Sequence, residues 1–336
     1  MDDPLRVLLV CPGRGSYGRG QRGSLGEWAL LPEIEAARRR SPTLGELDAA
    51  PFAPSTHLAG EHASLLTFAA TVRDLGALDP RRARVVAVAG NSLGFYTALY
   101  AAGALPLRDA GRLVETMGGY QAGAVVGAQV LYPTVGEDWR PDPELRDLVD
   151  AALALPGVFP SIHLGGTAVL GASEDALPAL LAALPPVERG RAFPLRLPLH
   201  SAFHTPLMRP TAERASVDLA SLPFASPTVP LVGGDARIWR RHADAAALRD
   251  YTLGAQVTQT FDLTASIRAA LGDYGPDAVV LPGPGDTLGA PVAQIMIAAG
   301  WRGLRDRQDF LEAQVSPHPP VLSMARPEQR ARVANA

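Results

Sequence analysis

The chain has 336 residues, of which 47% are hydrophobic and 19% are charged, and its formal net charge is −3. This balance excludes intrinsic disorder as the main state, because disordered chains are poor in apolar residues and rich in net charge. It also gives no support for nucleic-acid binding, which normally depends on a clustered basic field. The single cysteine, Cys11, excludes an internal disulfide framework and a cysteine-based zinc site.

The first residues, MDDPLRVLLVCPG, begin with acidic side chains and contain only a short apolar run. They do not have the pattern of a secretory signal peptide. The sequence also has no run of about 18 apolar residues, the length that a bilayer-spanning helix needs. We therefore expect a cytoplasmic protein that does not contact a membrane.

Three short apolar runs, each stopped by glycine or proline, predict buried strands at 6–11, 84–89 and 278–281. Residues 93–105 and 287–300 have the length and composition of helices. Strands that alternate with helices indicate an α/β protein with a mostly parallel sheet.

The middle of the chain follows a different order. Strands are predicted at 126–132, 158–164, 167–171 and 192–197, and helices at 143–153 and from Ser173 onward. The resulting order β-α-β-β-α-β is the ferredoxin-like motif. We therefore predict a small subdomain over 125–200, inserted into a large α/β subdomain formed by 1–124 and 201–314. Residues 315–336 lack periodicity and are predicted to form a C-terminal tail.

Residues Gly90 to Gly94 form the pattern G-x-S-x-G between a predicted strand and a predicted helix. This context is the one that a nucleophile elbow requires, because small residues on both sides permit a strained turn that exposes the serine. The helix that follows directs its N-terminus at the site, where it would stabilise developing negative charge. A chance turn in a glycine-rich chain is the alternative, but the strand and helix favour Ser92 as a nucleophile.

A serine hydroxyl needs a base that takes its proton. Most of the seven histidines lie in polar stretches or in a predicted strand: His57, His62, His163, His242 and His318. His200 and His204 lie in LPLHSAFHTPLM, where two prolines indicate an ordered loop, a common place for catalytic groups. The residues alone do not distinguish His200 from His204.

GNSLGFYTALYAAGAL at 90–105 resembles the GHSLGEYAALVAAGAL segment of malonyl-CoA:acyl-carrier-protein transacylases and polyketide synthase acyltransferase domains. CPGRGSYG at 11–18, SIHLGGTAVLGA at 161–172, SAFHTPLM at 201–208 and GPGDTL at 283–288 resemble further segments of that family, in the family's order. The resemblance extends from about residue 6 to residue 300. It implies an α/β-hydrolase-like core with a parallel sheet and an inserted ferredoxin-like subdomain, which agrees with the elements predicted above.

The resemblance implies a ping-pong acyl transfer that needs no bound cofactor and no metal. Ser92 would attack a thioester, with His204 as its base, and the phosphopantetheine thiol of an acyl carrier protein would then collect the acyl group. The backbone N–H groups of Arg14 and Leu93 would form the oxyanion hole. A main-chain carbonyl, expected near the segment that enters Gly283, would orient the histidine.

The sequence departs from the family at two positions of the expected acyl pocket, Met117 and Asn91. Met117 falls where the family has an arginine that binds the carboxylate of malonyl groups, and a thioether cannot offer that charged, bidentate contact. We therefore expect an acyl group without a free carboxylate, with room for a bulky one. Asn91 replaces the usual histidine before the nucleophile, and Phe203 precedes the catalytic histidine, where the family tunes acyl choice. A shifted alignment, or Arg112 in the missing arginine's place, is the alternative.

These residues predict an acyltransferase that acts with acyl carrier proteins in polyketide-type biosynthesis. A thioesterase that edits stalled chains would use the same residues but admit water. A catalytically silent scaffold that binds carrier proteins is disfavoured because Ser92 and His204 are both present, and ordinary malonyl loading is a further alternative. The sequence has no metal-binding motif and no complete dinucleotide fingerprint.

Overall fold

The computed structural model describes residues 3–38, 40–123 and 125–335. Its main sheet has six strands in the order β10-β9-β2-β1-β12-β13. Their bounds are β1 Leu5–Cys11, β2 Ala83–Gly90, β9 Leu231–Val232, β10 Ile238–Trp239, β12 Ala278–Leu281 and β13 Val321–Ser323. Neighbouring strands are parallel except β9 and β10, so the predicted mostly parallel sheet is confirmed.

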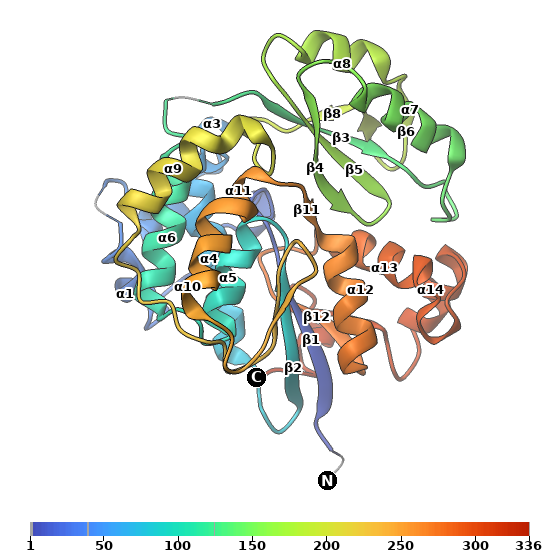
Figure 1. Ribbon diagram of the computed structural model, residues 1–336. Coiled ribbons are helices and arrows are strands. Elements are labelled where there is room, and N and C mark those ends of the chain that lie inside the picture. The colour runs from blue at the N-terminus through green and yellow to red at the C-terminus, as the bar shows by residue number, and fades with distance from the viewer. Residues whose placement is uncertain (1–2, 39, 124, 336) are drawn as a thin grey trace.

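Helices cover both faces of this sheet, which explains why its central strands are apolar on both sides. Figure 1 shows α4, α5 and α6 on one side and α12 and α13 on the other. These helices are α4 Gly60–Ala77, α5 Leu93–Ala101, α6 Leu107–Gly119, α12 Leu263–Tyr274 and α13 Gly289–Ala298. The predicted helices after the second and third core strands are α5 and α13.

Shorter helices and turns complete the large part of the molecule. They are η1 Arg19–Gln21, α1 Leu31–Glu35, α2 Leu44–Ala49, α3 Pro54–His57, η2 Pro206–Met208, α9 Arg209–Asp218, α10 Ala245–Asp250, η3 Tyr251–Ala255, α11 Gln256–Thr258, η4 Trp301–Gly303, α14 Arg307–Gln314 and α15 Pro327–Arg330. Among the described residues, no helix is both long and apolar enough to cross a membrane.

A second sheet, in the order β11-β4-β5-β3-β8, lies above the main one in Figure 1. Its elements are β3 Ala128–Pro133, α7 Pro143–Leu153, β4 Val158–Leu164, β5 Thr167–Ala172, α8 Leu177–Ala183, β8 Leu195–Arg196 and, from the large part of the chain, β11 Phe261–Asp262. The chain order β3-α7-β4-β5-α8-β8 is ferredoxin-like, as predicted, and β3, β4, β5 and β8 pair antiparallel. The strand β11 adds to this sheet beside β4 in parallel.

Two predicted elements of this region differ in detail. The strand expected at 192–197 is divided at Pro194, which has no N–H to donate. Its first half, β7 Ala192–Phe193, pairs with β6 Val187–Glu188, and its second half, β8, pairs with β3. Helix α8 begins at Leu177 and not at Ser173, whose hydroxyl instead accepts a hydrogen bond from the Ala176 N–H (3.3 Å) in the preceding turn.

The apolar side chains form two separate clusters. The larger surrounds the main sheet and its helices, and the smaller lies between α7, α8 and the second sheet. Two cores support the predicted division at 125 and 200, which stays a prediction; residue 124 lies outside the described residues.

The prediction of a C-terminal tail is wrong for its described part. Strand β13 pairs in parallel with β12 at the edge of the main sheet, and Val333 and Ala334 are fully buried. The sequence concealed this element because only three residues form the strand, within a stretch rich in proline and arginine.

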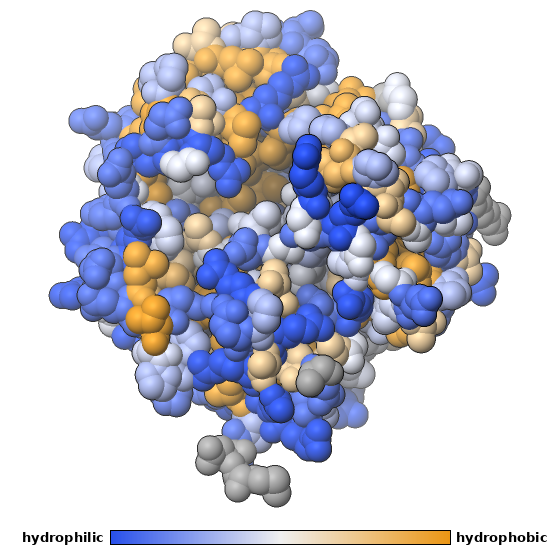
Figure 2. Space-filling view, turned by 180° about the vertical axis from the view of Figure 1, so that it is seen from behind, coloured by the Kyte–Doolittle hydropathy of each residue, from blue (hydrophilic) through white to orange (hydrophobic). Residues whose placement is uncertain are grey.

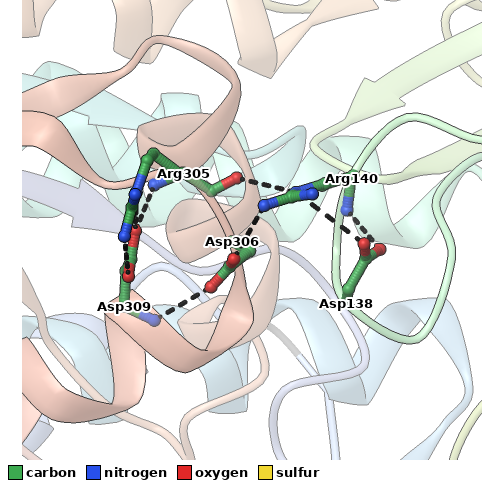
Figure 3. Close-up of polar contacts among 5 residues, drawn as sticks. All are labelled: Asp138, Arg140, Arg305, Asp306 and Asp309. Atoms are coloured by element: carbon green, nitrogen blue, oxygen red, sulfur yellow. Dashed lines mark hydrogen bonds and ion pairs between the residues drawn. The ribbon is translucent and has the colours of Figure 1, made fainter.

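A loop of the small sheet reaches the large part of the molecule beside α14 (Figure 3). Arg140 forms an ion pair with Asp306 at 2.8 Å, and the Arg307 N–H donates to the Asp138 carbonyl at 2.8 Å. The Trp139 ring packs beside the ring of Phe310, with 5.9 Å between their centroids. These contacts, here called the bridge, join the two sheets at one end of the space between them.

Candidate active site

A cavity of about 810 Å³ lies between the two sheets, and Ser92 lines it. Its walls are mostly apolar, with side chains from the small sheet on one side and from Leu288 and the first turn of α13 on the other. They include Leu131, Ile162, Leu164, Val169, Leu288 and Pro291. Figure 2 shows a hollow with hydrophobic walls below the upper lobe of the molecule. The exposed arginines Arg191 and Arg307 also line the cavity.

Ser92 occupies the turn between β2 and α5 in a strained backbone conformation. Its φ is 54° and its ψ is −112°, a region that non-glycine residues rarely adopt. The flanking glycines make the turn possible, because a Cβ on Gly90 would lie 2.2 Å from the Gly94 backbone and one on Gly94 would lie 2.2 Å from the Cys11 carbonyl oxygen. The turn therefore has the strand-turn-helix geometry of the nucleophile elbow that the pattern predicted.

His204 lies next to this serine. Its Nε2 is 2.7 Å from the Ser92 Oγ, and its Nδ1 donates to the Gln256 carbonyl at 2.6 Å. The imidazole is 1% exposed, and burial lowers the pKa of His204 to about 4. The ring is therefore neutral near pH 7, with Nδ1 protonated and Nε2 free to take the serine proton. Of the two candidate histidines, His204 is therefore the one that contacts Ser92.

The carbonyl that orients His204 is not where the sequence placed it. The acceptor is Gln256, whereas the Gly283 carbonyl accepts a hydrogen bond from the Thr71 hydroxyl at 2.6 Å. No sequence signal could have found this group, because every residue has a carbonyl and only the path of the chain decides which one meets the ring.

The side chain of Gln256 also contacts the nucleophile turn. Its Nε2 donates to the Ser92 carbonyl at 3.2 Å, and its Oε1 accepts from the Tyr96 hydroxyl at 3.0 Å. One residue thus fixes both the histidine and the strained serine.

His200 lies at the same cavity but in a different network. Its Nδ1 donates to the Pro198 carbonyl at 2.8 Å, and its Nε2 accepts from the Arg14 Nε at 3.1 Å. Burial and the neighbouring Arg14 cation lower the pKa of His200 to about 3, so it is also neutral. It makes no contact with Ser92 that would compete with His204.

The other expected site residues are distributed unevenly around the nucleophile. Arg14 and Asn91 line the cavity, and Leu93 is the first residue of α5, directly after Ser92. Met117 is 2% exposed and belongs to the core around α6, outside the cavity lining. The Phe203 ring packs against the core beside His204, with 6.2 Å between ring centroids.

Arg112, the sequence alternative for the missing arginine, lies away from the site. Its guanidinium is exposed and donates to the Ser221 hydroxyl at 3.2 Å and to the Asp218 carbonyl at 3.1 Å. It therefore supplies no charge to the cavity. Among the residues that the structure describes, no group of three or more histidine, cysteine or acidic side chains could hold a metal ion.

No protein-family model matches the chain. The malonyl CoA-acyl carrier protein transacylase of Salmonella typhimurium is 32% identical over 204 residues, which are 60% of this chain and 63% of that protein. The polyketide synthase GfsB of Streptomyces halstedii is 31% identical over 214 residues, 60% of this chain and 4% of that much longer protein.

The solved malonyl-CoA:acyl carrier protein transacylase of Xanthomonas oryzae matches the whole fold. The TM-score is 0.74 at 26% identity, and the match covers 99% of this chain and 100% of that one. The chain is similar in sequence and in fold to members of this acyltransferase family. The fold with its two sheets is therefore the one that the sequence resemblance implied. The chain spans only about 63% of the Salmonella relative, so activity, substrates and partners are treated below as proposals.

Proposed function

We propose that this protein is an acyltransferase that moves an acyl group from a thioester, through acyl-Ser92, to the phosphopantetheine thiol of an acyl carrier protein. The observation that carries the proposal is the 2.7 Å contact between the Ser92 Oγ and His204 Nε2 at a strained elbow that opens into a large apolar cavity. A hydroxyl, a neutral base and room for a thioester are the three requirements of this chemistry.

In the first half-reaction the His204 Nε2 takes the Ser92 proton while Oγ bonds to the thioester carbonyl carbon. The C–S bond then breaks, and the imidazolium returns its proton to the leaving thiolate. The second half-reaction runs the same steps in reverse order, with the carrier thiol as nucleophile. The Gln256 carbonyl supports both halves, because it stabilises the imidazolium that forms in each.

The negative charge on the thioester oxygen needs hydrogen-bond donors. Leu93 is at the first position of α5, where the N–H has no acceptor within the helix. We assign the oxyanion hole to this N–H and to the N–H of Arg14, on the loop that faces Ser92 across the cavity. Removing one such donor typically costs about 100-fold in rate, so both matter.

The proposed cargo is an acyl group without a free carboxylate. The resemblance aligns Met117 of α6 with the family's carboxylate-binding arginine, and Met117 is a buried core residue. The volume and the mostly apolar walls of the cavity suit the phosphopantetheine arm and an apolar acyl chain. The exposed Arg191 and Arg307 suit the phosphate of that arm, since guanidinium groups bind phosphate in a bidentate manner. The cytoplasmic location stays a prediction.

Acyl transfer and acyl hydrolysis are separated by one measurement. The protein is incubated with a carrier loaded with butyryl or malonyl groups and with a second, unloaded carrier, and the acyl-carrier and free-acid products are weighed. We expect butyryl to move to the second carrier faster than malonyl and faster than it is hydrolysed. Free acid as the main product would identify an editing thioesterase, and no product at all would favour a silent scaffold.

A further inference from the structure

The cavity contains a cation, Arg14, close to Ser92. The family resemblance implied a role only for the backbone N–H of this residue. Arg14 lines the cavity together with Ser92 and Asn91, on the loop that follows β1. Its guanidinium lies against the start of α4, because a Cβ added to Gly60 would come within 2.8 Å of Nη1. It thus extends from the oxyanion loop, beside Ser92, to the N-terminus of α4.

Three neutral groups hold this guanidinium in place. The Nε donates to His200 at 3.1 Å, the Nη1 donates to the Gln121 Oε1 at 2.8 Å, and the Nη2 donates to the Leu199 carbonyl. These bonds use three N–H hydrogens and leave the others without a partner among the described residues. The guanidinium of Arg14 is therefore fixed in position and still has N–H groups that can donate to a ligand.

The charge of Arg14 is also not compensated by the protein. Among the described residues it makes no ion pair, and its three partners carry no negative charge, since His200 is neutral. Burial lowers the pKa of Arg14 to about 10, so it remains a cation at neutral pH. A partly buried, positioned cation with unused donors binds oxygen acceptors strongly.

We propose that Arg14 is the residue that reads the acyl group, by donating hydrogen bonds to an oxygen carried on the acyl chain. This rests on the proposed acyl transfer and names its substrate class. The matching cargo is an acyl group with a neutral oxygen close to the thioester, such as a 3-oxo group. A carboxylate offers the same acceptor chemistry, and the experiment separates the two sources.

The test compares pantetheine thioesters of butyryl, 3-oxobutyryl and malonyl groups. The rate at which each acylates Ser92 is followed by intact mass, and the readout is the ratio of rates within one protein, which does not depend on the active fraction. We expect 3-oxobutyryl to load at least about tenfold faster than butyryl, the value of one charge-assisted hydrogen bond. In Arg14→Met the ratio should fall to about one.

Two variants make the comparison specific. In Arg14→Lys the ratio of 3-oxobutyryl to butyryl loading should lie between that of the unaltered protein and that of Arg14→Met, because lysine retains the charge but not the planar guanidinium. Arg112→Met removes an exposed arginine that also has hydroxyl and carbonyl partners. This variant should show the same ratio as the unaltered protein.

An unchanged ratio in Arg14→Met, or equal loading of butyryl and 3-oxobutyryl by the unaltered protein, would overturn the role of Arg14. If malonyl loads fastest and this preference disappears in Arg14→Met, the role of Arg14 is supported. The proposal that the cargo has no free carboxylate is then overturned. Loading of none of the three would overturn acyl transfer itself.

Discussion

At the scale of single residues, the proposed acyl transfer requires that His204 be neutral before the reaction. A surface histidine is about half protonated near pH 6.5 and is then no base. Burial of His204 lowers its pKa to about 4, and the Gln256 carbonyl opposes this shift by favouring the imidazolium. The same ring is thus a free base at neutral pH and is ready to be charged in the transition state.

The rate of Ser92 acylation should therefore stay level from pH 8 to about pH 5.5 and fall as the pH approaches 4. The measurement is the initial acylation rate against pH with a donor that does not titrate in this range, such as a butyryl thioester. A midpoint near 6.5 would show that the histidine keeps the pKa of an exposed ring and would contradict this environment.

The same shift makes the fold sensitive to acid. Because the folded pKa lies below the unfolded value of 6.5, the unfolded chain binds more protons between these values, and stability is lost as the pH falls through this window. From pH 7 to pH 5 this ring should cost about 2 kcal/mol of unfolding free energy. Urea unfolding of His204→Gln should show a smaller pH dependence than the unaltered protein by about that amount.

At the scale of elements, the sequence predicted the strands and helices whose own apolar pattern shows which residues are buried. Continuous apolar runs predicted the strands β1, β2 and β12, and a helical periodicity predicted α7. The bounds of α7 and β12 are those that were predicted. Strand β13 was missed because its pairing with β12 is a tertiary event. The Gln256 carbonyl and the Arg14 side chain were missed for the same reason: their roles depend on neighbours far along the chain.

The elbow between β2 and α5 leaves no room for a side chain at its glycines. In Gly94→Ala the new Cβ would lie 2.2 Å from the Cys11 carbonyl oxygen, which is backbone and cannot move away cheaply. We expect a loss of about 3 kcal/mol or more in unfolding free energy, measured with urea. Gly272→Ala, within α12 and with no heavy atom within 4 Å of the added Cβ, is the matched control.

The control should gain up to about 1 kcal/mol, because alanine favours helix over glycine. If both variants had the same stability, the close approach of α5 to β1 would not be a constraint on the turn.

At the scale of the whole molecule, two cores enclose the cavity, and the bridge between residues 138–140 and 305–310 fixes one end of it (Figure 3). The fold class and the inserted subdomain followed from the alternation of patterns along the chain. The bridge did not, because exposed arginine and aspartate side chains occur all over the sequence and only the fold decides which of them meet.

Arg140→Ala should loosen the bridge without unfolding the protein. In its ion pair with Asp306, the Arg140 side chain is more than half exposed. Exposed ion pairs contribute at most about 1 kcal/mol to the free energy of unfolding. Hydrogen exchange should therefore quicken at 134–141 and 305–310 while global stability changes little. Arg240→Ala removes an exposed pair of 2.7 Å with Asp273 within the large part and should leave exchange at the bridge unchanged. Equal exchange in both variants would show that the bridge does not hold the two parts together.

The most direct test of the account is to locate the acyl group on the protein. After brief incubation with a butyryl-loaded carrier, the quenched protein is digested and its peptides are weighed. We predict one butyryl group, on the peptide that contains Ser92, absent from Ser92→Ala and removed when unloaded carrier is added. Transfer between carriers that continues in Ser92→Ala, or a stable label on another residue, would contradict the central role of this serine.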